Sequence, residues 1–250
     1  MADAALSFDR DGVIVFDADP RVEAWAAAAH RIGCEVAADP DMRARWLRHG
    51  GTWFVGVDAL PNDKDGAIDA VPLQGPWEGL ITPPAAWHPA QLSVVFPGYP
   101  QKDPDESVAN HQFRVRRAAA HVDGLHLEDG RRILREPHAF VLGLPLSDSS
   151  ACPLRVWPGS HHRFAAAFRA ALLNGAVLGS DLTETYKETR ADCFEQIEPI
   201  DLRLRPGQSV LLHRLTLHGV APWHPKDEAP PEGRMVAYFR PEFPNADQWL

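Results

Sequence analysis

The chain has 250 residues, of which 45% are hydrophobic and 24% charged, values typical of a soluble globular protein rather than of a disordered or membrane-embedded one. Its formal net charge is -9 and its lysines and arginines are scattered, so we expect no nucleic acid partner. The cysteines, Cys34, Cys152 and Cys193, are widely separated and form no Cys-x-x-Cys pair, which argues against a disulfide framework and a thiolate zinc site.

The length fits a single domain, residues 1–250, with a sizeable core. The first ten residues contain acidic side chains and no apolar signal region. No stretch approaches the roughly 20 apolar residues of a membrane span. We therefore expect a cytoplasmic protein without a membrane partner.

Most of the helices that we expect lie in the first hundred residues. The patterns predict a strand at 13–16, a helix at 21–32 ended by Gly33, a helix at 41–48 and a strand at 52–57. Residues 61–104 are rich in Pro, Gly and Asp, which indicates irregular loops with one helix at 85–92. Loops of this kind often form active-site walls, to which Trp53, Trp77 and Trp87 are candidate contributors.

Short strands dominate the rest of the chain. They are expected at 111–120, 131–134, 139–146, 154–157, 200–204, 209–213 and 234–240, with one helix at 163–173 that Ser160 caps. Turn residues such as Asp129-Gly130 separate them. The pattern favours a β-rich α+β protein with a double-stranded β-helix core, the jelly roll of cupin-like proteins. Residues 105–250 would form this metal-binding core, covered by the helices and loops of residues 1–104.

One short motif offers metal ligands. On extended backbone, His121 and Asp123 present an imidazole and a carboxylate on the same face. His218, beside Gly219 and after an apolar strand, offers a third ligand. Two imidazoles and one carboxylate on one face of an octahedron leave three open positions, as in non-haem Fe(II) oxygenases. The pair His126 and Glu128 has the same spacing as the first motif, but it adjoins the Asp129-Gly130 turn, which would leave it solvated.

Several motifs together carry a family resemblance. The chain from about residue 111 onward resembles the phytanoyl-CoA dioxygenase-like family. The matching motifs, in order, are His121-x-Asp123, Cys152-Pro153-Leu154-Arg155-Val156-Trp157-Pro158-Gly159-Ser160-His161, Leu211-Leu212-His213-x4-His218-Gly219 and Arg234. The resemblance implies a double-stranded β-helix that binds Fe(II) through His121, Asp123 and His218. It also implies 2-oxoglutarate as cosubstrate, with its far carboxylate on Arg234, and molecular oxygen as the oxidant.

The chain departs from the family at the cosubstrate site. Residues 219–233 make the spacing to Arg234 longer than usual, and Val220 stands where many members have Ser or Thr. Arg240 shares a strand face with Arg234 and competes for the same role. By strand parity with His121, Arg117 is a candidate for binding an acidic substrate.

We therefore expect a dioxygenase that hydroxylates a small organic molecule and releases succinate and CO₂. A carboxylate at Asp123 distinguishes the site from halogenating relatives, in which a small residue leaves room for chloride. The alternatives are a cupin-like metal enzyme that works without 2-oxoglutarate and a non-catalytic small-molecule binding module.

Overall fold

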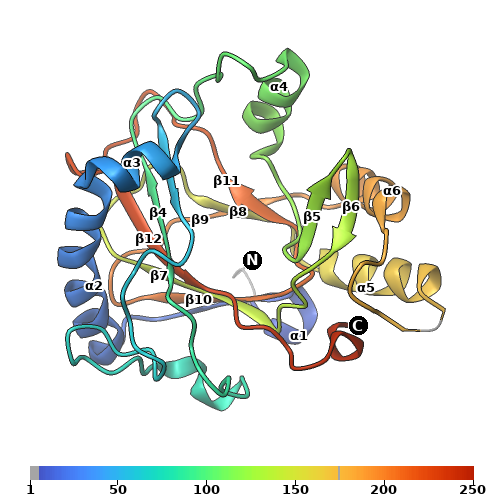
Figure 1. The fold of residues 1–250 in the computed structure, drawn as a ribbon, viewed down its shortest axis with the longest axis horizontal. Coiled ribbons are helices and arrows are strands. Elements are labelled where there is room, and N and C mark those ends of the chain that lie inside the picture. The colour runs from blue at the N-terminus through green and yellow to red at the C-terminus, as the bar shows by residue number, and fades with distance from the viewer. Residues whose placement is uncertain (1–5, 174) are drawn as a thin grey trace, which may run out of the picture.

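The computed structural model describes residues 6–173 and 175–250, and these fold around a seven-stranded antiparallel sheet (Figure 1). Its strands, in spatial order, are β1 (Val13–Phe16), β10 (Ser209–His213), β7 (Phe140–Pro145), β12 (Arg234–Phe239), β4 (Gln91–Val95), β3 (Trp53–Gly56) and β2 (Leu47–Arg48). Four of the strands come from the first hundred residues, and two of these, β1 and β4, pair with strands of the second half. The N-terminal part therefore contributes to the sheet as well as covering it.

A smaller sheet faces the large one. It consists of β11 (His218–Val220), β8 (Leu154–Val156) and β9 (Ile200–Leu202), and the hairpin of β5 (Leu125–Glu128) and β6 (Arg131–Leu134) lies beside it. Apolar side chains of both sheets pack into one buried cluster, which comprises Val13, Val141, Val210 and Leu212 from the large sheet and Leu154 and Val156 from the small one. The architecture is thus mixed α/β, with a large antiparallel sheet packed on a small one.

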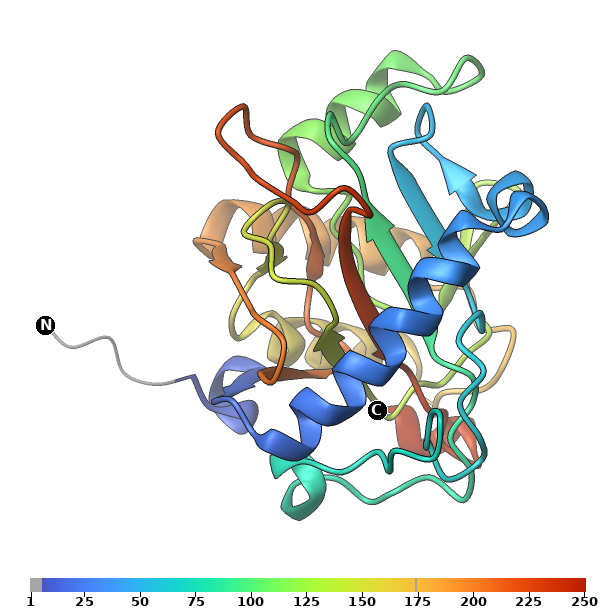
Figure 2. The same cartoon turned by 90° about the vertical axis from the view of Figure 1, so that its left-hand side faces the viewer.

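The long helix α2 (Pro20–Ala38) covers the outer face of the large sheet (Figure 2). It starts where Asp19 accepts a hydrogen bond from the Arg21 N–H, with Pro20 in the first turn. The predicted end at Gly33 is wrong, because Gly33 lies inside the helix against the sheet. A Cβ atom there would lie 3.3 Å from Leu92 Cδ1, so glycine permits the close packing.

The strand predicted at 111–120 is wrong, because this segment lies largely in helix α4 (Val108–Arg117). Ser107 Oγ accepts a hydrogen bond from the Asn110 N–H at 3.1 Å and caps the helix. None of the residues of α4 is buried, so the helix lacks the apolar stripe by which the sequence of a buried helix is recognised. Ala118 and Ala119, both with positive φ, end it.

One further helix prediction is wrong, and one helix is not predicted by the sequence. Residues 85–92 form no helix; the Ala90 N–H donates instead to the Asn62 side chain, and β4 begins at Gln91. Helix α5 (Ser160–Ala171) confirms the helix expected at 163–173, but α6 (Thr183–Gln196) follows without having been predicted. Its buried face consists of Thr183, Tyr186, Thr189 and Cys193, which give little hydrophobic periodicity.

The remaining elements are short. They are α1 (Phe8–Asp11), α3 (Pro40–Trp46), and the 3₁₀ turns η1 (Pro76–Gly79) and η2 (Ala246–Trp249). Among the residues that the structure describes, no helix has the length and apolar character needed to cross a membrane.

Candidate metal centre

The two histidines of the predicted triad lie side by side. His121 and His218 form an isolated antiparallel bridge, in which each N–H donates to the other's carbonyl, at 2.9 and 3.0 Å. Their ring centroids are 4.9 Å apart. The bridge joins the segment after α4 to the start of β11, so residues 97 positions apart share one site.

Asp123 completes the group. Its Oδ1 lies 3.2 Å from His121 Nε2, and its Oδ2 lies 3.9 Å from His218 Nε2. One possible ligand atom from each residue falls within 4.8 Å of the other two. Asp123 and His218 are buried, and His121 is partly exposed. The structure therefore brings together the three residues that the sequence singled out.

Both imidazoles are oriented by a carbonyl two residues earlier. His121 Nδ1 lies 3.1 Å from the Ala119 oxygen, and His218 Nδ1 lies 2.8 Å from the Thr216 oxygen. A carbonyl oxygen only accepts, so each Nδ1 carries a proton and donates it. Each Nε2 is then left to share a proton with Asp123 or to bind a metal ion.

The charge states suit a cation. Burial favours the neutral acid, but the hydrogen bond with His121 and the electrostatic effects of the nearby His218 and Arg240 outweigh it and hold the pKa of Asp123 well below its ordinary value. Burial lowers the pKa of His218, partly opposed by Asp123. At neutral pH the site therefore offers a carboxylate and a neutral buried imidazole.

Two glycines allow the backbone segments to approach. A Cβ at Gly219 would lie 2.2 Å from the Ala118 carbonyl oxygen, and one at Gly124 would lie 2.3 Å from the Glu136 carbonyl oxygen. Gly124 also has a φ of +88°, which side chains disfavour. Substitution of Gly219 would push apart the segments that carry the two histidines, and substitution of Gly124 would displace the segment that carries Asp123.

Ser160 has a different role from the predicted one. Gly159 is the cap residue of α5, while Ser160 Oγ accepts a hydrogen bond from the Leu217 N–H at 2.8 Å. Ser160 is fully buried. It therefore holds the residue that precedes His218.

The triad lines a cavity of about 480 Å³ between the large sheet, α4 and the β5–β6 hairpin. Its walls include Trp53, Ser93, Phe113, Leu127 and Tyr238. Trp53 thus lines the cavity as expected from the sequence. Trp77 is buried in the core under α2, and Trp87 packs on Phe140 and Phe239, so neither is a wall of this cavity.

Arg234 is buried on β12, with 7% of its surface exposed. Its Nη1 has no hydrogen-bond partner among the described residues. A buried guanidinium with a free donor is costly unless an anion completes it, so the side chain is suited to a carboxylate ligand. Arg234 is not among the residues that line the cavity of the triad, whereas Arg240, on the same strand face, does line it.

Arg117 does not have the position that the sequence suggested. It lies on α4 rather than on a strand, so parity with His121 does not direct it to the site. Its guanidinium stacks over Phe194, 4.7 Å from the ring centroid, and it is exposed and absent from the cavity wall.

Sequence reasoning missed two other arginines, Arg114 and Arg132, which do line the cavity. Arg114 could not be found because the sequence predicts a strand where it lies on helix α4. Arg132 could have been found, because β6 is predicted correctly and adjacent residues of a strand, here Arg131 and Arg132, point to opposite faces.

The side chains of the second candidate motif, His126 and Glu128, form ion pairs with other residues. His126 Nε2 lies 3.2 Å from Glu136, and Glu128 pairs with Arg135 at 2.7 Å. These two residues are not grouped with a third candidate ligand in the described part of the chain. His213 also stays outside the triad, because its Nδ1 accepts a hydrogen bond from the Leu215 N–H at 3.1 Å.

No protein-family model matches the chain, and no curated protein matches it in sequence. Solved structures do resemble it. The non-heme alpha ketoglutarate dependent carbocyclase SnoK from nogalamycin biosynthesis is 16% identical, with a TM-score of 0.54 over 93% of this chain and 80% of that one. The epimerase SnoN, in complex with Fe3+, alpha ketoglutarate and nogalamycin RO, is 18% identical, with a TM-score of 0.52 over 93% of this chain and 79% of that one. The chain therefore shares the fold of these two enzymes.

Proposed function

We propose that this protein is a non-haem Fe(II)- and 2-oxoglutarate-dependent dioxygenase of the phytanoyl-CoA dioxygenase-like type, which hydroxylates a small organic molecule. The observation that carries the proposal is the convergence of His121, Asp123 and His218 at the wall of a cavity between two sheets. We interpret the two sheets as a double-stranded β-helix, and the shared fold with SnoK and SnoN supports this interpretation.

The donor set fits Fe(II). Two imidazole nitrogens and one carboxylate are the donor types of the facial triad of non-haem iron oxygenases, and such a set would leave coordination positions for a cosubstrate and for oxygen. A thiolate is absent from the group, which argues against a structural zinc site. When bound, Fe(II) with 2-oxoglutarate and molecular oxygen would supply the oxidising power for C–H hydroxylation, with succinate and CO₂ as coproducts.

Arg234 fits the far carboxylate of 2-oxoglutarate. Its burial and its free Nη1 provide a charge-assisted donor that is shielded from water. Val220 offers no hydroxyl to assist, so in this chain the arginine would carry the carboxylate with less help than in many relatives. The SnoN complex contains both Fe3+ and alpha ketoglutarate, which is consistent with such a pair of ligands on this fold.

The other groups of the chain orient and shield the reacting substrate. The carbonyls of Ala119 and Thr216 fix the imidazole rings, and Ser160 holds the segment before His218. Trp53, Phe113 and Tyr238 line the cavity and would pack against the substrate. The protein would thus position a C–H bond beside the metal without contributing a nucleophile.

The test is succinate formation from 2-oxoglutarate by the Fe(II)-loaded protein in air. We expect conversion that depends on iron and oxygen and is lost in Asp123→Ala but retained in His126→Ala. Iron binding at the triad without any succinate, with or without candidate substrates, would favour a cupin-like enzyme that does not use 2-oxoglutarate. Failure to bind iron would favour a non-catalytic binding module.

A further inference from the structure

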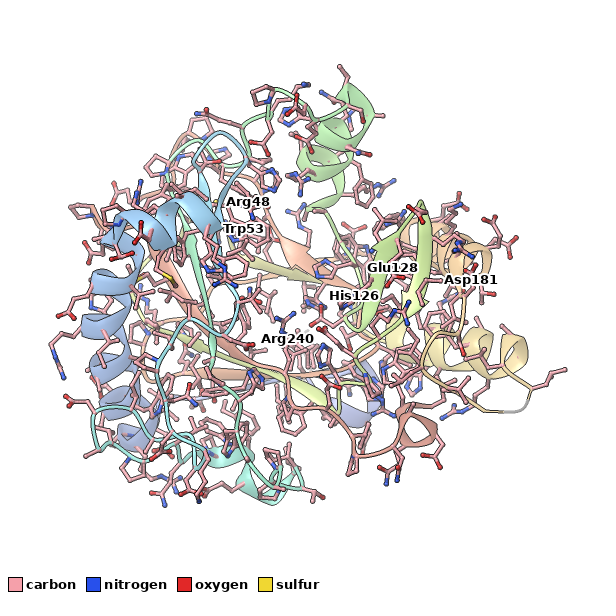
Figure 3. The ribbon with its side chains drawn as sticks, in the orientation of Figure 1. Arg48, Trp53, His126, Glu128, Asp181 and Arg240 are labelled. Atoms are coloured by element: carbon pink, nitrogen blue, oxygen red, sulfur yellow. The ribbon has the colours of Figure 1, made fainter. Side chains whose placement is uncertain are left out.

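We propose that the cavity beside the triad recognises an oxyanion on the substrate, a carboxylate or a phosphate, and that Arg132 and Arg240 hold it. The inference rests on the proposed function and adds the class of substrate to it. Both guanidinium-bearing residues line the same cavity as His121, Asp123 and His218. Arg240 enters from the large sheet and Arg132 from the β5–β6 hairpin. Figure 3 shows Arg240 between these two elements, with Trp53 on the sheet side.

Arg240 is held in place but is not neutralised. Its Nη2 donates to the Gln91 amide oxygen at 2.6 Å, and its backbone N–H donates to His88 Nε2 at 2.8 Å. Among the described residues no carboxylate forms an ion pair with it. It lines the same cavity wall as Asp123 and His218. A neutral amide thus positions a cation whose charge remains available to a ligand.

Arg132 is held in a similar way. Its Nη1 donates to the Leu125 carbonyl at 3.3 Å, and its guanidinium lies over the Tyr186 ring, 5.2 Å from the centroid. Neither contact neutralises its charge, and none of the described carboxylates is within ion-pair distance of it. The adjacent Arg131 is exposed and is not part of the cavity wall, because neighbouring residues of a strand point to opposite faces.

Arg114, the third arginine that lines the cavity, differs from Arg132 and Arg240 in having a carboxylate partner. Arg114 donates to the Glu106 carboxylate at 2.8 Å, and the side chain of Glu106 is 8% exposed. Arg114 therefore already has its anion. The difference between paired Arg114 and the two unpaired arginines indicates that the latter are reserved for a ligand.

The sum of the charges at the site also predicts an anionic substrate. Fe(II), the Asp123 carboxylate, the dianion of 2-oxoglutarate and Arg234 together carry no net charge. The Arg114–Glu106 pair is also neutral. Arg132 and Arg240 then leave two positive charges in a cavity of a protein whose net charge is -9. Buried or partly buried charges of one sign are compensated by a ligand of the other sign, so the substrate is expected to be anionic.

Arg234, at the start of β12, and Arg240, just after its end, would bind different anions. Arg234 and Arg240 lie six positions apart on one strand face, so their Cα atoms are separated by about 20 Å. We therefore assign the two guanidinium groups to different anions. With Arg234 assigned to 2-oxoglutarate, Arg240 is left for the substrate.

The experiment uses the full-length protein loaded with paramagnetic Co(II) and saturating 2-oxoglutarate. Methylphosphonate is compared with its neutral dimethyl ester by ³¹P relaxation, and trifluoroacetate with trifluoroacetamide by ¹⁹F relaxation. We expect saturable paramagnetic relaxation for at least one of the two anions and none for either neutral partner. Whether phosphonate or carboxylate binds more tightly identifies the type of oxyanion.

Variants assign the binding to the two residues. Arg240→Gln and Arg132→Gln should each weaken anion binding about tenfold or more, as expected for the loss of a charge-assisted contact. Arg240→Lys should restore part of it, and Arg131→Gln on the same strand should leave it unchanged. Metal and 2-oxoglutarate loading is measured first in every variant. If the unmodified protein loads neither, the proposed function and this inference both fall.

Three results would overturn the inference alone while the metal and 2-oxoglutarate still bind. The first is equal or absent relaxation for the charged and neutral probes. The second is anion affinity that is unchanged in both Arg240→Gln and Arg132→Gln. The third is an Arg240→Gln variant that loses affinity for 2-oxoglutarate rather than for the probe, which would give Arg240 the cosubstrate role.

Discussion

The two imidazoles of the candidate metal centre are prepared in the same way. Each Nδ1 donates to the carbonyl two positions earlier in the chain, Ala119 for His121 and Thr216 for His218. The ring orientation is thus set by the local backbone before any metal arrives. Such preorganisation lowers the entropy lost on binding.

Removal of either imidazole should abolish tight iron binding. For His121→Ala and His218→Ala we expect iron affinity to fall by more than about 100-fold, the upper cost of losing an outer-shell partner. His126→Ala is the matched control, because His126 contacts Glu136 instead of the triad. Equilibrium dialysis with Fe(II) under anaerobic conditions measures the effect. Unchanged iron stoichiometry in both ligand variants would rule out this triad.

His213 should make stability depend on pH. Burial, together with the positive charges of Arg214 and the neighbouring histidines, lowers its pKa to about 3. The unfolded chain, with an ordinary pKa near 6.5, therefore binds a proton that the folded state rejects as the pH falls below that value. The neutral side chain's contribution is fully present above pH 6.5 and is lost as the pH falls toward the folded pKa.

The expected slope is about 1.4 kcal/mol of unfolding free energy per pH unit over the range where only the unfolded state is protonated. His213→Gln should remove this part of the slope. Urea unfolding of metal-free protein at several values between pH 6.5 and 4.5 tests the prediction. Parallel curves for the two proteins would show that His213 is not the group responsible.

At the scale of elements, the site depends on a close approach between β11 and the segment that follows α4. Gly219→Ala would place a methyl group 2.2 Å from the Ala118 carbonyl oxygen. We expect a loss of about 1–3 kcal/mol in unfolding free energy, as for other overpacked positions, together with weaker iron binding. Gly79→Ala is the control, because a Cβ there meets no atom within 4 Å. Equal unfolding midpoints for the two variants would contradict the account.

Elements whose pattern reflects burial could be predicted from the sequence, and the others could not. Strands β6 and β10 match their predicted bounds, because alternation or apolar character reports the buried face directly. The sequence predicts a strand in place of α4 because α4 has no fully buried residue to give it a helical pattern, and it does not predict α6 because the buried face of α6 is made of Thr, Tyr and Cys. The positions of Arg132 and Arg240 in one cavity depend on how two sheets pack, which no local pattern encodes.

The triad was accessible to sequence reasoning for a different reason. Metal ligands need specific residue types, and His121 and Asp123 are only two positions apart on one extended segment. The predicted role of Arg117 depends on a strand, whereas Arg117 lies on helix α4. Parity arguments transfer to a site only when the element itself is correctly predicted.

At the scale of the whole molecule, the reaction outcome follows from the ligand set. Under the proposed function, Asp123 would fill the metal position that a small residue leaves free for chloride in halogenating enzymes of this type. We therefore expect a hydroxylated product, with its new oxygen taken from O₂, when a substrate is turned over in the presence of chloride. Mass spectrometry of products formed under ¹⁸O₂ tests this. A chlorinated product from the unmodified protein would show that Asp123 does not bind the iron.

We propose that the chain binds iron through His121, Asp123 and His218 and 2-oxoglutarate through the iron and Arg234. Anaerobic titration of the Fe(II)-loaded protein with 2-oxoglutarate tests it most directly, because chelation of the metal gives a weak visible charge-transfer band. We predict a band that saturates at one equivalent of 2-oxoglutarate per iron. In Arg234→Ala it should require at least about tenfold more 2-oxoglutarate, since a charge-assisted pair is lost while the iron stays bound. Full iron occupancy without a band at any 2-oxoglutarate concentration would contradict the account.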